Sequence, residues 1–174
     1  MTSSITPRIV PAAPAGDQDF DSASYLRRIV REMRVCALAT TDSQTGYPYL
    51  TSVNAAANRR GQVLFLTSLV APHSRNMRKD PRLSIMCYVD ESGESWAHGR
   101  PLTAGRVTLS GMAHVTDTPE DIEDFLSAHK KLSVAVKNGG FSIWKLSPQG
   151  VEMMGGPRLA PELRVEDLKI SNLS

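Results

Sequence analysis

A basic segment that follows an apolar run is the part of this sequence best suited to chemistry. The run Leu64–Leu66 ends on Thr67 and Ser68, and a short helix-forming stretch comes after it. That stretch contains His73, Ser74, Arg75, Asn76, Arg78 and Lys79. Hydroxyl groups at a strand end, helix N–H groups and cations can converge on one phosphate. The pattern therefore predicts an oxyanion site, and the alternative is a connector whose charges only face solvent.

Three further polar positions could converge on this segment. Thr51 and Ser52 lie on the strand expected before the Asn58–Gly61 turn. A hairpin through that turn would pair their strand with the strand ending at Thr67, and so bring the hydroxyl groups together. Arg106 lies on a later strand. For Thr51 and Ser52 the alternative is that they are ordinary β-prone residues on a half-polar strand.

The motifs disfavour other kinds of site. The sequence contains no GxSxG, GxGxxG or GxxxxGK[ST] motif, which argues against a serine hydrolase and against the common nucleotide-binding loops. The histidines are scattered without metal-ligand spacing, so no metal site is expected. They are His73, His98, His114 and His129. Cys36 and Cys87 both lie in apolar runs, where buried hydrophobic roles are usual.

Composition sets the broad class. The chain has 174 residues and a mass of 19.0 kDa, enough for one domain with a buried core. The formal charge is +2 and aromatic residues are few, so no nucleic-acid partner is expected. The N-terminus carries no apolar leader, and no run of about 18 apolar residues occurs, so neither export nor membrane spanning is predicted. A reducing cytoplasm is the expected compartment.

The elements that must position these residues are mostly strands. Residues 1–20, rich in Pro, Ala and Ser, are expected to form a flexible arm, and residues 21–174 a single domain. Helices are predicted from Asp21 or Ser22 onward and at residues 73–79, 119–129 and 165–170. Strands are predicted at residues 34–41, 47–58, 62–67, 82–90, 103–116, 141–146 and 151–154, with a polar loop at 91–101. Six or seven antiparallel strands with short helices indicate an α+β barrel.

Six motifs occur in the same order as in a known family. They are ALATTD, GYPYLTSV, LFLTS, HSRNMRKDPRLSI, GRVTLSG and VEMMGGPR, and they span residues 37–158. The succession resembles the pyridoxamine 5′-phosphate oxidase-like FMN-binding split barrels, and it is most similar to their haem-utilisation members of the HugZ type. The resemblance implies a six-stranded antiparallel split β-barrel with short flanking helices. It also implies a homodimer with FMN sites in the clefts between subunits, and a small-molecule substrate.

The resemblance also implies which residues bind the cofactor. Thr51 stands where the oxidases use a phosphate-binding Arg, and Thr67 with Ser68 matches their strand-end hydroxyl pair. His73 takes the place of a phosphate-binding Lys, and Pro72 replaces the Arg before it. With Ser52 from the strand pattern, the expected cofactor site is completed by Arg75, Asn76, Arg106 and Arg158. The Gly155–Arg158 segment would carry its Arg toward the substrate side of the flavin.

Departures from the family pattern change the expected activity. Ala56 stands where the oxidases have the Lys that grips the substrate phosphate, so oxidation of pyridoxamine phosphate itself is not expected, and Met153 replaces a flavin-packing Trp. Haem-degrading members use a His near the C-terminus as the axial ligand, but no His follows His129. A haem ligand would therefore be one of the four histidines named above. The sequence predicts an FMN-dependent oxidoreductase of unknown substrate. A haem-binding or haem-degrading protein, and a non-catalytic flavin- or tetrapyrrole-binding regulator, are the alternatives.

Overall fold

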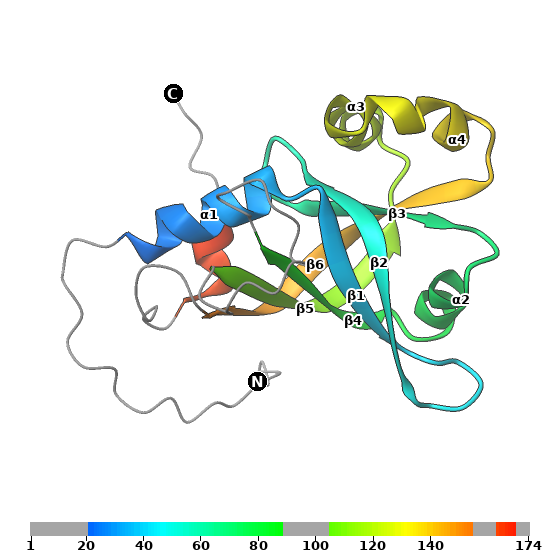
Figure 1. Cartoon of the computed structure of the whole chain (residues 1–174), viewed down its shortest axis with the longest axis horizontal. Coiled ribbons are helices and arrows are strands. Elements are labelled where there is room, and N and C mark those ends of the chain that lie inside the picture. Colours follow the sequence, from blue (N-terminus) through cyan, green and yellow to red (C-terminus); the bar gives the residue numbers. More distant parts are fainter. Residues whose placement is uncertain (1–20, 89–104, 155–162, 170–174) are drawn as a thin grey trace, which may run out of the picture.

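The chain forms a closed, six-stranded antiparallel barrel with the strand order β1-β2-β3-β6-β5-β4 (Figure 1). The structure, a computed structural model, describes residues 21–88, 105–154 and 163–169. The strands are β1 (Val35–Thr41), β2 (Pro48–Ala57), β3 (Val63–Ser68), β4 (Arg82–Tyr88), β5 (Arg106–Val115) and β6 (Phe141–Met154). The barrel confirms the predicted fold class, while the predicted arm at 1–20 and loop at 91–101 lie outside the described residues.

Short helices surround the barrel. They are α1 (Ser22–Glu32), α2 (Pro72–Lys79), α3 (Pro119–Ala128) and α4 (Ser133–Lys137), with 3₁₀ turns η2 (Lys130–Leu132) and η3 (Val165–Leu168). Figure 1 shows α1 at one end of the barrel and α2 at the other, with α3 and α4 beside β3. The sequence analysis did not predict α4 or η2. No helix in the described ranges is both long and apolar enough to cross a bilayer.

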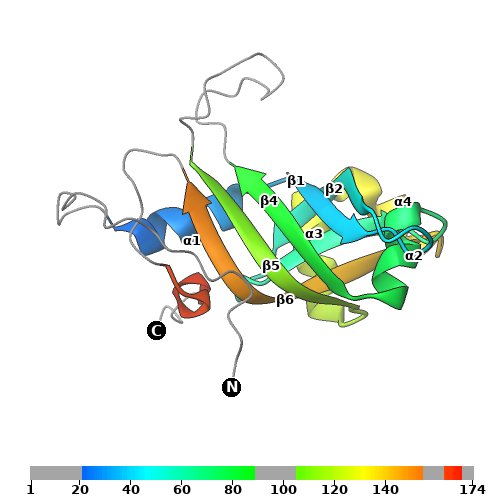
Figure 2. The ribbon, with the colours of Figure 1, turned by 90° about the horizontal axis from the view of Figure 1, so that it is seen from below.

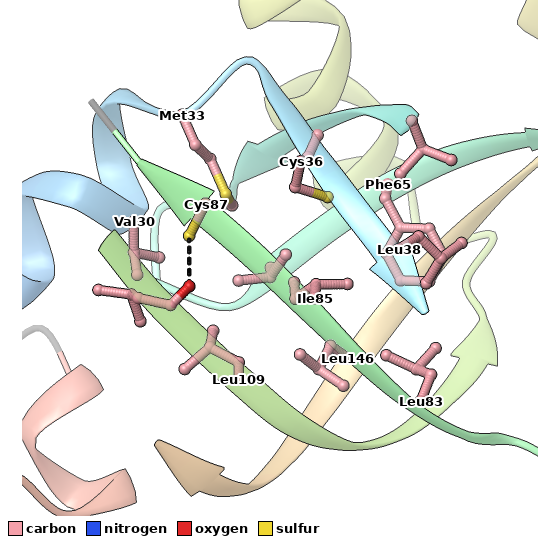
Figure 3. Close-up of a cluster of buried hydrophobic side chains, with 14 of the residues drawn as sticks. Val30, Met33, Cys36, Leu38, Phe65, Leu83, Ile85, Cys87, Leu109 and Leu146 are labelled. Carbon is pink, nitrogen blue, oxygen red and sulfur yellow. Dashed lines mark hydrogen bonds between the residues drawn. The ribbon is translucent and has the colours of Figure 1, made fainter. Parts of the chain in front are cut away.

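The core lies inside the barrel and under α1. Asp21 caps α1 by accepting a hydrogen bond from the Ser24 backbone N–H at 2.9 Å. The buried positions of α1 follow the helical period predicted from the sequence, and Figure 3 shows Val30 and Met33 beside Cys87 at one end of a cluster that includes side chains of β1, β3, β4, β5 and β6. Cys36 and Cys87 are free thiols within this core, as expected. Burial raises the pKa of both thiols, that of Cys87 to about 12.

Strand β6 differs from the prediction of two strands at residues 141–146 and 151–154. It is one strand that continues through the Pro-containing segment by means of a bulge. Its pairing with β5 shifts at this point, because Ser110 lies opposite Gly150 whereas Gly111 lies opposite Pro148. Proline lacks the N–H group that a regular ladder uses, so it is tolerated where the ladder is broken. The SPQG segment is therefore a bulge within one strand and not a break between two strands.

Strands β2 and β3 pair only near the turn that joins them. Their ladder runs from Ala57–Val63 to Ala55–Phe65 and ends there. The rest of β2 pairs with β1, and the end of β3 pairs with β6. Residues 48–54 of β2 and residues 66–68 of β3 do not pair with each other. We call this interruption of the ladder the seam. The hairpin ladder therefore does not extend to Thr51 and Ser52, and the expected approach of their hydroxyl groups to β3 does not follow from it.

The bulge yields a stability prediction. A Cβ atom on Gly111 would lie 2.9 Å from Pro148 Cα and still closer to the Ser147 carbonyl, so Gly111→Ala should destabilise the fold by about 2 to 3 kcal/mol. Gly150→Ala is the matched control, because the nearest atom to its added Cβ is Ser110 Cβ at 4.0 Å. Urea unfolding measures both variants. Equal stability of the two would contradict the described bulge.

Candidate functional site

Helix α2 carries three of the predicted site residues, His73, Arg75 and Asn76, and closes the barrel beside the seam. Its N-cap is Ala71, which has no polar side chain, and Pro72 occupies the first helical position. The first-turn N–H groups therefore have no side-chain acceptor at the N-cap. The helix ends at Asp80, because a residue before proline disfavours helical backbone. The predicted helix at 73–79 is thus confirmed.

The hydroxyl groups on one side of α2 form a chain that runs into the core. The Trp144 indole donates from Nε1 to Thr67 Oγ1 at 2.9 Å, and Ser74 Oγ lies 2.7 Å from the same oxygen. Ser74 Oγ also lies 2.6 Å from the Ser68 carbonyl oxygen, to which it can donate. Thr67 and Ser74 are both buried. The Thr67 hydroxyl, predicted to contact a cofactor, is thus engaged within the protein.

Asn76 attaches the other side of α2 to the β1–β2 hairpin. Its Oδ1 accepts from the Ser43 backbone N–H at 2.9 Å, and its Nδ2 donates to Thr40 Oγ1 at 3.1 Å. The Asn76 side chain is fully buried. Lys79 adds a hydrogen bond from Nζ to the Ser43 carbonyl at 2.5 Å. Both ends of the Asn76 amide are therefore used to hold α2, although the sequence assigned this residue to the cofactor.

His73 is the residue of α2 whose polar groups are not used. It lies four positions before the buried Met77, so both side chains share the inner face of the helix. Both ring nitrogens are shielded from solvent and have no hydrogen-bond partner in the described part of the chain. Burial lowers the pKa of His73. The ring is consequently neutral near pH 7, with one N–H group and one free lone pair.

Arg75 faces a different side of α2. It lies two positions after His73, about 200° around the helix axis, and it is exposed. Its side chain makes no hydrogen bond or ion pair with any described residue, although its backbone N–H donates to the Ala71 carbonyl at 3.3 Å. The pKa of Asp42 is lowered mainly by the Thr45 side chain, with a smaller effect from the charge of Arg75. Arg75 and His73 therefore do not converge as the sequence analysis expected.

The remaining predicted residues are spread over two faces of the barrel. Thr51 alternates with the buried Val53, so it points inward at the seam, while Ser52 is exposed on the outer face. Arg106, also on the outer face, pairs with Met154 at one end of β6. Ser68 pairs with Phe141 at the opposite end of the same strand. Ser68 and Arg106 therefore cannot reach one small cofactor within a single chain, and Arg158 lies outside the described residues.

Apolar side chains are exposed next to the start of α2. Leu69 and Val70, which precede the helix, are 37% and 91% exposed, and Phe141 of the neighbouring β6 is 40% exposed. The Leu69 N–H donates to the Gly140 carbonyl at 3.1 Å, which joins the β3–α2 connection to the start of β6. Exposed side chains of this size are a suitable surface for a large planar ligand.

Sequence reasoning missed the residues that hold α2 in place. Ser74 was noted only as part of the basic segment, and neither Trp144 nor Thr40 was singled out. The spacing of Ser74 and Met77 by three positions, with Asn76 between them, was a usable signal because it marks a buried helix face that contains polar residues. Such residues need partners inside the protein. The identity of those partners depends on the barrel pairing and is not readable from local sequence.

Comparison with known proteins shows which proteins this chain resembles. Residues 24–155 match the Pyridoxamine 5′-phosphate oxidase family. No curated protein matches the sequence. A haem-binding protein from Mycobacterium smegmatis is 29% identical, with a TM-score of 0.70 over 84% of this chain and 59% of that one. Protein Atu2129 from Agrobacterium tumefaciens, of unknown function, is 25% identical, with a TM-score of 0.76 over 95% of this chain and 66% of that one.

A third structure extends the likeness in fold. The haem storage protein HutZ from Vibrio cholerae is 23% identical, with a TM-score of 0.54 over 74% of this chain and 92% of that one. At this identity the likeness concerns the fold alone. This chain spans about two thirds or less of the lengths of the Agrobacterium and Mycobacterium proteins.

The two hydrogen bonds of Asn76 yield a prediction about its role. Asn76→Ala should destabilise the chain by about 2 kcal/mol, because the buried Ser43 N–H and Thr40 hydroxyl lose their partner. Urea unfolding measures the loss. A large loss of affinity with unchanged stability would instead support the cofactor role that the sequence assigned.

Proposed function

Because the chain belongs to the pyridoxamine 5′-phosphate oxidase family, we propose that it binds a planar cofactor beside α2 and that this cofactor is haem. The observation that carries the proposal is the His73 imidazole, which is neutral, inward-facing and without a partner. A neutral imidazole nitrogen is the usual protein ligand of haem iron. His73 would therefore hold the iron.

The surroundings of His73 suit haem. Leu69, Val70 and Phe141 offer exposed apolar surface to a porphyrin face. The shielded ring nitrogens reach iron only if the imidazole turns about its side-chain bonds, and this rotation breaks no hydrogen bond because the ring makes none. Bound haem would supply a redox-active iron. The description of the Mycobacterium smegmatis relative as a haem-binding protein supports the same assignment.

FMN is the second candidate, and one feature favours it. The α2 N-terminus has no side-chain cap, so its N–H groups could bind the flavin phosphate, with Ser68 nearby. Fixed positive charge is scarce, however, because Pro72 and the neutral His73 stand at the positions where the oxidases carry Arg and Lys. Phosphate binding draws most of its strength from charge-assisted hydrogen bonds. With FMN the chain would be a flavin-dependent oxidoreductase acting on a small molecule.

The proposal includes a homodimer in the cytoplasm. The outer face of β1, β4 and β5, together with the Leu50 end of β2, carries the small Ala37 and Ala39 and is not covered by the described helices, whereas α3 packs over the other end of β2 at Ala56 (Figure 2). The uncovered face also carries exposed apolar side chains, namely Val35, Leu50, Met86 and Met112. Ser52 and Arg106 lie on this same face. A second chain packed here could bring them to the α2 region of its partner, which they cannot reach in their own chain.

Haem titration with His73→Ala tests the proposal. We expect the wild type to give a sharp Soret band and the variant to bind at least about tenfold more weakly, because it loses the iron ligand. Protonation competes with iron for the ring, so wild-type affinity should fall as the pH decreases through the pKa of His73, below the ordinary value of about 6.5. His114→Ala is the control, since His114 is exposed on β5.

Parallel titration with FMN separates the two candidates. Tight FMN binding without a haem Soret band would favour a flavoprotein and exclude haem as the cofactor. Adding NAD(P)H under air then distinguishes turnover from binding alone, which is the behaviour of a non-catalytic regulator. Equal haem affinity of His73→Ala and wild type would exclude His73 as the ligand.

Sedimentation equilibrium tests the dimer. Met86→Lys introduces a charge into the centre of the exposed sheet face, where Met86 is 38% exposed, and should shift the dimer toward monomer at micromolar concentration. Val134→Lys is the matched control, because Val134 is 66% exposed on α4, outside this face. A wild-type protein that is monomeric at this concentration would contradict the proposed homodimer.

A further inference from the structure

We propose that Trp144, Thr67 and Ser74 form a positioning chain, which sets the direction of His73 for cofactor binding. The inference rests on the proposed role of His73. None of the three side chains needs to touch the cofactor. Their effect would pass through α2, where Ser74 is the neighbour of His73.

The chain is complete in its hydrogen bonds. The indole N–H of Trp144 can only donate, and it donates to Thr67 Oγ1 at 2.9 Å. The Ser68 carbonyl oxygen can only accept, and it lies 2.6 Å from Ser74 Oγ. Ser74 Oγ also donates to Thr67 Oγ1 at 2.7 Å, so Thr67 Oγ1 accepts from both Trp144 and Ser74, and the single Ser74 hydrogen is shared between Thr67 and the Ser68 carbonyl. The Thr67–Ser74 pair is therefore the link between the core and α2, and removing either hydroxyl leaves buried groups without their partner.

The chain begins at a fixed point of the barrel. Trp144 is 3% exposed and belongs to the core cluster. Its backbone pairs with Phe65 of β3 and with Val115 of β5, so the strands on both sides fix its position. The other end of the chain is the first turn of α2, which has no capping side chain. The hydroxyl groups thus fix the position of the first turn of α2, which carries His73, relative to the core.

Orientation of His73 depends on the rotation of α2 about its axis. One residue corresponds to about 100° of rotation, so a modest turn of the helix would displace the Cα–Cβ bond about which the imidazole must turn to reach the iron. Ser74 holds the helix to β3, and Asn76 holds it to the β1–β2 hairpin. Anchors on two sides oppose this rotation. Removing the Ser74 anchor should therefore leave the helix attached but its first turn poorly oriented.

Isosteric substitutions test the role of the hydroxyl groups. Thr67→Val keeps the volume and removes the hydroxyl, and Ser74→Ala removes the next member of the chain. We expect both variants to bind haem about tenfold more weakly or worse, with a changed Soret band, as is typical when a partner that orients a metal ligand is lost. Thr67→Ser keeps the hydroxyl and should retain the wild-type affinity and Soret position. In a Trp96→Phe background, the emission of Trp144 should change in Thr67→Val and not in Thr67→Ser.

Thr116→Val controls for the general effect of losing a buried hydroxyl. Thr116 Oγ1 donates to Asp121 Oδ2 at 2.7 Å where α3 meets the barrel, and its removal should leave the Soret band unchanged. The inference is overturned if folded Thr67→Val and Ser74→Ala keep the wild-type haem affinity and Soret position. It is also overturned if Thr67→Ser loses as much haem affinity as Thr67→Val. If Thr67→Val does not fold, Ser74→Ala decides by the same readout. Failure of the wild type to bind haem would instead overturn the proposed function.

Discussion

The arrangement depends on how α2 is held at a place where the barrel ladder is interrupted. Strands β2 and β3 part after Ala55–Phe65, and α2 closes the barrel beside the resulting seam. Buried polar contacts on two sides of the helix, through Ser74 and Asn76, replace the strand-to-strand pairing that is missing there. A helix of eight residues is too short to be stable by itself. Its position, and with it the direction of His73, is therefore decided by these side-chain hydrogen bonds.

The elements with a clear period were predictable, and the polar contacts were not. The helix beginning at Ser22 and the alternation along β4 follow from local spacing of apolar residues. The bulge in β6 was missed because Pro148 and Gly150 are typical of turns, and only their pairing with Gly111 reveals a continuous strand. Likewise, Asn76 is polar and lies in a basic segment, yet its partners Thr40 and Ser43 are far away in sequence. Arg75 was grouped with His73 by proximity in sequence, whereas helical geometry separates the two.

A second buried polar network attaches α3 to the barrel in a comparable way. Asp121 accepts hydrogen bonds from Asn58, Thr116 and Lys145 at 2.7 to 2.8 Å. Burial alone would raise the pKa of Asp121, but these donors outweigh it and hold the pKa well below its usual range. The carboxylate thus stays charged at neutral pH with its partners satisfied. Both networks place polar side chains where a short helix meets a sheet, and both rely on several partners around one residue.

The two buried cysteines can report how often the barrel opens. Thiol reagents attack the thiolate, and at neutral pH that form is scarce for Cys36 and Cys87, whose pKa values burial raises. Both side chains lie in the core between β1, β4 and α1 (Figure 3), so a reagent in water reaches them only when these elements separate. The rate of thiol labelling in the unmodified protein therefore measures how often the barrel opens.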